Sequence, residues 1–138
     1  IRSAPPGRTW LEGPGLTDPS PVDFKGERHL FVSELGRGVV HHSGEPLREV
    51  QAWGQLQVPH AVTVGDQLWV VAQARIRALR QPVLARSLDG RSFSSWTPLL
   101  AEGAIEHCAS PVLGPSPAGG FVLLCVSEQP PPAGGGLL

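Results

Sequence analysis

Residues 48–71 read REVQAWGQLQVPHAVTVGDQLWVV, and this stretch contains the repeating unit from which the fold is predicted. A short segment ends at Trp53, and a connector leads to an apolar run at 60–62. The pair Gly65-Asp66 follows, and it suits a tight hairpin because glycine adopts a positive φ at little cost. A second run, 68–71, completes the unit with the valine, leucine and tryptophan residues that strands favour.

The same order of elements recurs along the chain. Trp10, Trp53 and Trp96 lie at equal intervals of 43 residues, and each ends a short segment that precedes a similar pair of runs. The paired runs are 20–22 with 30–33, 60–62 with 68–71, and 110–112 with 121–127. A further element occurs in two copies, 38–44 and 82–90, and the second ends in the hairpin-like pair Asp89-Gly90. Each unit therefore contains four candidate strands.

Four short strands repeated every 40 to 50 residues are typical of the blades of a β-propeller. A blade has two apolar faces and buries both only when neighbouring blades stack on it. We therefore predict an all-β fold of propeller type, with about three blade equivalents in residues 1–129 and a flexible Pro/Gly tail at 130–138. A β-sandwich also uses short strands at regular spacing and is the alternative.

The predicted blades do not make a complete ring. Residues 1–3 resemble the end of a third strand, residues 8–10 resemble a fourth strand, and the last predicted strand ends near Ser127. Closed propellers have at least four blades. Exposed strand edges and blade faces promote association, so we expect either further blades elsewhere or self-association of two copies. The number of blades in the finished ring stays open.

Charge and motifs exclude several functions. The formal net charge of −1 gives no field that would attract nucleic acid or anionic lipid. No apolar stretch is long enough to span a bilayer. The sequence has no phosphate-binding GxxxxGK loop and no zinc-type cysteine spacing, so no cofactor is predicted. Histidines occur at 41, 42, 60 and 107, but adjacent residues of a strand face opposite sides, so no metal site is predicted.

The two cysteines, Cys108 and Cys125, leave two interpretations open. In the simplest hairpin register they lie opposite each other, which makes a disulfide geometrically feasible. A disulfide would suit an oxidising compartment and so favours a secreted or extracytoplasmic location. Two buried thiols explain the sequence equally well, and the localisation is therefore not predicted.

Three segments resemble a known family. The sequence DPSPV at 18–22, followed by KGERHLF at 25–31, resembles the first-blade signature of five-bladed propeller glycosidases of the arabinanase and β-xylosidase type, which are related to the invertase and levansucrase clan. Residues 87–96 look like the S-x-D-G-x-x-W turn of these and sialidase-type propellers, and 106–112 resembles the region of the acid glutamate. The resemblance covers most of residues 16–128.

The resemblance implies candidate site residues. Asp18 matches the catalytic aspartate and Glu106 the general acid, the two carboxylates that hydrolysis of a glycosidic bond requires. His60, His107 and Trp69 are the expected substrate-binding residues, although Trp69 also suits the core. The prediction is a carbohydrate-directed propeller domain of glycoside hydrolase type, active or inactive, with a glycan as partner. The alternative is a non-catalytic module, either lectin-like or structural. The sugar is not predicted.

Overall fold

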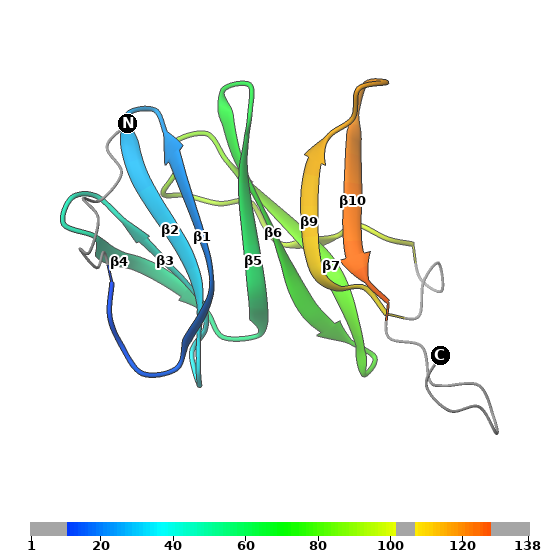
Figure 1. Cartoon of the computed structure of the whole chain (residues 1–138), viewed down its shortest axis with the longest axis horizontal. Helices are drawn as coiled ribbons and strands as arrows, with labels where there is room; N and C mark the ends of the chain where they lie inside the picture. The colour runs from blue at the N-terminus through cyan, green and yellow to red at the C-terminus, as the bar shows by residue number, and fades with distance from the viewer. Residues whose placement is uncertain (1–10, 102–106, 128–138) are drawn as a thin grey trace.

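The computed structural model describes residues 11–101 and 107–127. All helices and strands assigned in these ranges are β-strands, and no helix is present there (Figure 1). The strands are β1 (Leu16–Phe24), β2 (Glu27–Glu34), β3 (Gly38–Ser43), β4 (Arg48–Trp53), β5 (Leu56–Val64), β6 (Gln67–Ile76), β7 (Leu79–Ser87), β8 (Thr97–Pro98), β9 (Ala109–Pro115) and β10 (Phe121–Val126). In these ranges no helix is long and apolar enough to cross a bilayer.

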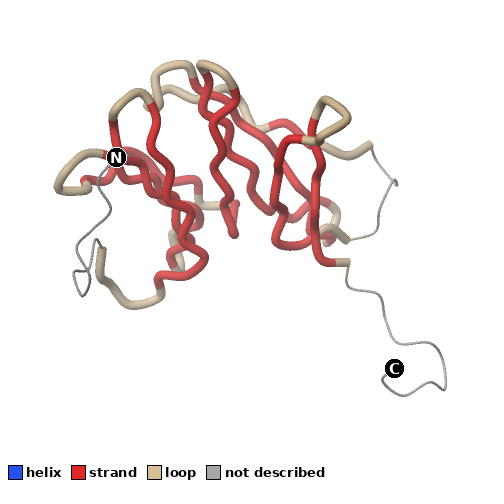
Figure 2. Tube along the Cα trace, turned by 45° about the horizontal axis from the view of Figure 1, so that its top comes forward, coloured by secondary structure: helices blue, strands red, loops and turns tan. Residues whose placement is uncertain are grey.

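The strands form three antiparallel sheets in chain order. The first blade has the order β1-β2-β3-β4, the second blade has β5-β6-β7-β8, and the third sheet pairs β9 with β10. Figure 2 shows these sheets following one another as an arc, with β1, β5 and β9 in neighbouring positions. Four-stranded blades are confirmed, and the described strands do not form a sandwich of two facing sheets. The strands predicted in residues 1–10 and the tail at 130–138 lie outside the described residues.

Each innermost strand contains the same bulge. The register of β1, β5 and β9 shifts at a pair made of one residue and a following proline. These pairs are Asp18-Pro19, Val58-Pro59 and Ser110-Pro111, and the residue before proline has φ of 52, 51 and 52° respectively. Proline cannot donate to the strand ladder, and the residue before it is kept out of the right-handed helical region. The bulges therefore define equivalent positions in the three sheets.

This equivalence corrects one part of the sequence alignment. The triplet at 110–112 corresponds to 18–20, whereas the sequence pattern had aligned it with the similar Ser-Pro-Val at 20–22. The error arises because only the proline at the bulge marks the position, and Pro21 lies in the regular part of β1.

Side chains of one blade bind the backbone of the next at repeated positions. At the first junction, Ser20 Oγ accepts a hydrogen bond from the Ala61 amide (2.9 Å), and Ser33 Oγ accepts from Val58 (2.8 Å). At the second junction the equivalent acceptors are His60 Nδ1 and Gln73 Oε1, which bind the amides of Leu113 (3.3 Å) and Ser110 (2.9 Å). These bonds give acceptors to the bulge amides of Val58 and Ser110, and to the amides of Ala61 and Leu113 farther along the same strands.

The core between the two blades is apolar and aromatic. Phe24, Phe31 and Val39 of the first blade pack against a cluster from the second. The second-blade members are Leu56, Ala61, Leu68, Val70, Ala72 and Val83. Trp53 and Trp96 pack edge to face with ring centroids 5.3 Å apart, as the repeat predicted for blade packing. Trp10 lies outside the described residues.

The loop after β7 differs from the expected hairpin at Asp89-Gly90. Asp89 Oδ1 accepts hydrogen bonds from the Ser87 hydroxyl and from the amides of Arg91 and Ser92, which organises a longer loop. These bonds, those of the two amides foremost, lower the pKa of Asp89 to about 2. Arg91 then forms an ion pair with Glu27 (2.7 Å), so the loop fastens the second blade to the first.

Candidate functional site

Asp18 is displayed by the bulge of β1 at the start of the innermost strand. Its side chain is exposed, and its φ of 52° places it in the left-handed region, which aspartate tolerates better than most residues. It borders a hollow of about 360 Å³. The hollow is lined by Gly15, Thr17, Asp18, Ser33, Glu34, Leu35 and Gln57. Residues with hydroxyl, carboxylate and amide side chains thus line the same hollow as Asp18, at the junction of β1, β2 and β5.

His60 lies elsewhere on the inner strands. It follows the bulge of β5, and its Nδ1 accepts the hydrogen bond from Leu113 at the junction with the third sheet. Burial lowers the pKa of His60, so the ring is neutral at pH 7. The residues that line the hollow at Asp18 do not include His60. Its structural role at the blade junction is therefore established, and a role in substrate binding stays a prediction.

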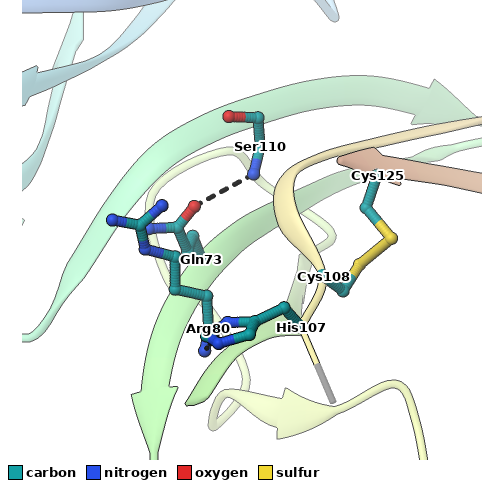
Figure 3. The surroundings of a disulfide bond; sticks show 6 residues. All are labelled: Gln73, Arg80, His107, Cys108, Ser110 and Cys125. Carbon is teal, nitrogen blue, oxygen red and sulfur yellow. Dashed lines mark hydrogen bonds between the residues drawn. A yellow bond between two sulfur atoms is a disulfide. The ribbon is translucent and has the colours of Figure 1, made fainter. Parts of the chain in front are cut away.

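His107 and Trp69 lie at the boundary between the second blade and the third sheet. His107 Nδ1 accepts a hydrogen bond from the Arg80 amide at 3.4 Å, beside the start of β9 (Figure 3). The Trp69 ring centroid lies 5.0 Å from that of Phe121 on β10, and its Nε1 donates to Gln67. The structure does not bring these two side chains to the hollow at Asp18.

Glu106 belongs to residues 102–106, which lie outside the described residues, so its pairing with Asp18 stays a prediction. The bulges of the other two innermost strands carry Val58 and Ser110 at the position of Asp18. Asp18 is consequently the one carboxylate at this position among the inner strands that the structure describes.

Cys108 and Cys125 form a disulfide with their Cα atoms 5.1 Å apart (Figure 3). This answers the question that the sequence left open between a disulfide and two thiols. The register is not the simplest one, because the bulge at Ser110-Pro111 places Val126 opposite Ala109. The disulfide connects the approach to β9 with the end of β10.

The first blade contains a buried histidine pair that the sequence analysis did not predict. His29 Nδ1 and His41 Nε2 are 2.9 Å apart, and both residues are fully buried. The His41 ring stacks on Phe31 with centroids 4.3 Å apart. Alternation along β2 and β3 was the signal that could have placed both on one face. In the described ranges, no group of three or more metal-ligating side chains is assembled.

No protein-family model and no curated protein matches the sequence of the chain. Solved structures of family-43 glycoside hydrolases, which are five-bladed propellers, do match. A thermostable family-43 glycoside hydrolase superposes with a TM-score of 0.61 at 15% identity, over 79% of this chain and 40% of that one. An arabinanase from Bacillus subtilis gives 0.62 at 13% identity, over 83% and 49% respectively.

A third structure is that of a β-xylosidase/α-arabinofuranosidase from a compost microbial metagenome, in complex with xylotriose. It gives a TM-score of 0.59 at 13% identity, over 84% of this chain and 44% of that one. The chain thus spans less than half the length of these three structures. Its fold is that of part of a β-propeller of the family-43 glycoside hydrolase type.

Proposed function

We propose that the chain is part of a carbohydrate-binding propeller whose ligand occupies the hollow at Asp18. The observation that carries the proposal is the display of an exposed carboxylate on a left-handed bulge, beside Thr17, Glu34 and Gln57. Sugar hydroxyls are bound by carboxylate and amide groups of this kind. The fold likeness supports the class of ligand, since one of the similar structures holds xylotriose.

Hydrolysis needs a second carboxylate. A retaining reaction places the two carboxyl groups about 5 Å apart, and an inverting reaction places them roughly 6.5–9.5 Å apart. Val58 and Ser110 cannot supply the second group from the equivalent positions. Glu106 is the acid that we assign to it within this chain, so binding rests on Asp18 and catalysis rests on Asp18 together with Glu106.

Titration of the chain with xylotriose and with arabinose oligosaccharides tests the binding step. We expect Asp18→Asn to weaken binding at least about tenfold, because a hydrogen bond to a charged group contributes roughly 1.5–3 kcal/mol. Asp66→Asn is the matched control, since Asp66 is an exposed aspartate in the turn at the far end of β5. Equal binding by both variants, or no binding to any of these sugars, contradicts the proposal.

Release of reducing sugar tests the catalytic step separately. Activity that is lost in both Asp18→Asn and Glu106→Gln supports a glycoside hydrolase. Binding without hydrolysis by the unaltered chain supports a lectin-like role for it.

A further inference from the structure

Leu35 forms an exposed apolar rim on the hollow at Asp18. It occupies the turn between β2 and β3, and its side chain is 86% exposed. The hollow is walled mainly by carbon atoms, although polar side chains also line it. A single exposed leucine indicates nothing by itself. Leu35 differs because it lines the candidate site, whereas the residues that line the hollow do not include Leu88, which is 60% exposed.

The backbone on one side of the turn fixes where Leu35 lies. The Leu35 amide donates a hydrogen bond to the Gly15 carbonyl (3.0 Å), outside the strand ladder. Gly15 has a φ of 74°, and a Cβ placed there would lie 2.8 Å from the Leu35 Cβ. Leu35 therefore packs directly against the backbone that leads into β1 and the bulge at Asp18.

Arg37 fastens the same turn from the other side. Its amide donates to the Glu34 carbonyl (2.9 Å). Its guanidinium donates two hydrogen bonds to the carboxylate of Glu49 on β4 and one to that of Glu34 (3.3 Å). The turn is thus attached both to the segment before β1 and to β4. A side chain that is already held in place loses less conformational freedom when a ligand covers it.

An apolar rim beside carboxylates suits a ligand that has both an apolar face and hydroxyl groups. A pyranose ring with all its hydroxyls equatorial is of this form. Its axial C–H bonds make both faces of the ring apolar, and its hydroxyls point outward around the edge. The xylose units of xylotriose have this arrangement. An arabinofuranose ring is a puckered five-membered ring with substituents on both sides, so it offers no comparable apolar face.

We propose that Leu35 determines which sugar the hollow accepts, by packing against the apolar face of a pyranose ring whose hydroxyls bind Asp18. This inference rests on the proposed function and adds the class of sugar to it. Removing leucine surface from water is favourable in proportion to the apolar area that is covered. The gain is consequently larger for a ring with an apolar face than for one without it.

Calorimetric titration with xylotriose and with an arabinofuranose trisaccharide tests the inference. The unaltered chain should bind xylotriose more tightly. We expect Leu35→Ser to weaken xylotriose binding about tenfold, less than complete burial of a leucine would give, and to change binding of the arabinose trisaccharide less than about threefold. Leu35→Met keeps an apolar side chain and should bind xylotriose as the unaltered chain does. Leu88→Ser is the matched control and should alter neither affinity.

The heat capacity of binding distinguishes apolar contact from a disturbed fold. Xylotriose binding should have a negative heat-capacity change that becomes smaller in Leu35→Ser, and the midpoint of thermal unfolding should stay the same because Leu35 is exposed.

Two results would overturn this inference while leaving the role of Asp18 intact: equal xylotriose binding by Leu35→Ser and Leu88→Ser, or tighter binding of the arabinose trisaccharide by the unaltered chain. Failure of the proposed function has a different signature. The unaltered chain would then bind neither sugar, or Asp18→Asn would bind as Asp66→Asn does.

Discussion

The buried histidine pair should make the first blade sensitive to acid. Burial, followed by the charges that His29 and His42 would carry, lowers the pKa of His41 from 6.5 to about 3. Burial also lowers the pKa of His29, although Glu27 opposes the shift. His29 Nε2 and His41 Nδ1 have no hydrogen-bond partner, so a proton added there would stay unsolvated.

The sign of the effect follows from the lowered pKa. The unfolded chain binds a proton near pH 6.5, whereas the folded chain excludes it until about pH 3. Stability is therefore fully present above pH 6.5 and falls as the pH drops from 6.5 towards 3. For His41 alone, the free energy of unfolding at pH 4.5 should be roughly 3 kcal/mol lower than at pH 7.5.

Denaturant unfolding of the chain and of His41→Phe at both pH values measures this loss. Phenylalanine keeps the stack on Phe31 but removes the titrating group and the bond to His29, so the variant is less stable at pH 7.5. Its difference in stability between the two pH values should nevertheless shrink by roughly 3 kcal/mol. A His41→Phe variant with the same pH dependence as the unaltered chain would refute the reasoning.

Two backbone features and the disulfide give further predictions. Val58→Asn should raise the free energy of unfolding by roughly 1 kcal/mol, because a β-branched residue is strained at φ 51°. Val62→Asn, at a regular position of β5, should give no such gain. Thermal unfolding of the two variants compares them. Gly90→Ala should lower the free energy of unfolding by roughly 2 kcal/mol or more, because φ is 80° there and the new Cβ would lie 2.8 Å from the His29 ring. Gly65→Ala is the control: its Cβ meets no neighbour, so the same assay should show a smaller loss. Replacing both cysteines by serine should lower the free energy of unfolding by about 3 kcal/mol, because the disulfide joins residues separated by 17 positions. An unchanged midpoint of urea unfolding would contradict a structural role for the disulfide.

Fold class was predictable because blade packing repeats along the chain. The equal intervals between the tryptophans do not mark equivalent positions, because the bulges recur after 40 and then 52 residues, but Trp53 and Trp96 do pack against each other beside the core. Strand pairing within each blade is also local, since consecutive strands form hairpins. These relations involve neighbours in the sequence, and alternation together with turn residues is sufficient to read them.

Contacts between blades were not predictable from the same patterns. Ser20 binds the amide of Ala61 only after two sheets have stacked, and nothing local to either residue indicates the bond. The histidine pair lies within the first blade and depends on the exact register between β2 and β3. The bulges also explain why 110–112 was aligned with 20–22 instead of 18–20. A shift of two residues keeps the same alternation of faces, so the sequence pattern does not reveal it. Register and stacking are tertiary properties, and they decided which polar side chains became structural.

The bulge at Asp18 shows how far the fold alone can support a function. The same left-handed geometry recurs at Val58, where valine is strained, and the hydrogen bond that the Val58 amide donates to Ser33 Oγ holds the residue in place. The bulge is therefore a feature of every described inner strand and is no evidence of a site by itself. What distinguishes Asp18 is the carboxylate that the bulge displays beside a hollow. The comparison of Asp18→Asn with Asp66→Asn isolates that carboxylate, because each substitution changes only the charge of an exposed side chain and leaves the backbone geometry available to asparagine.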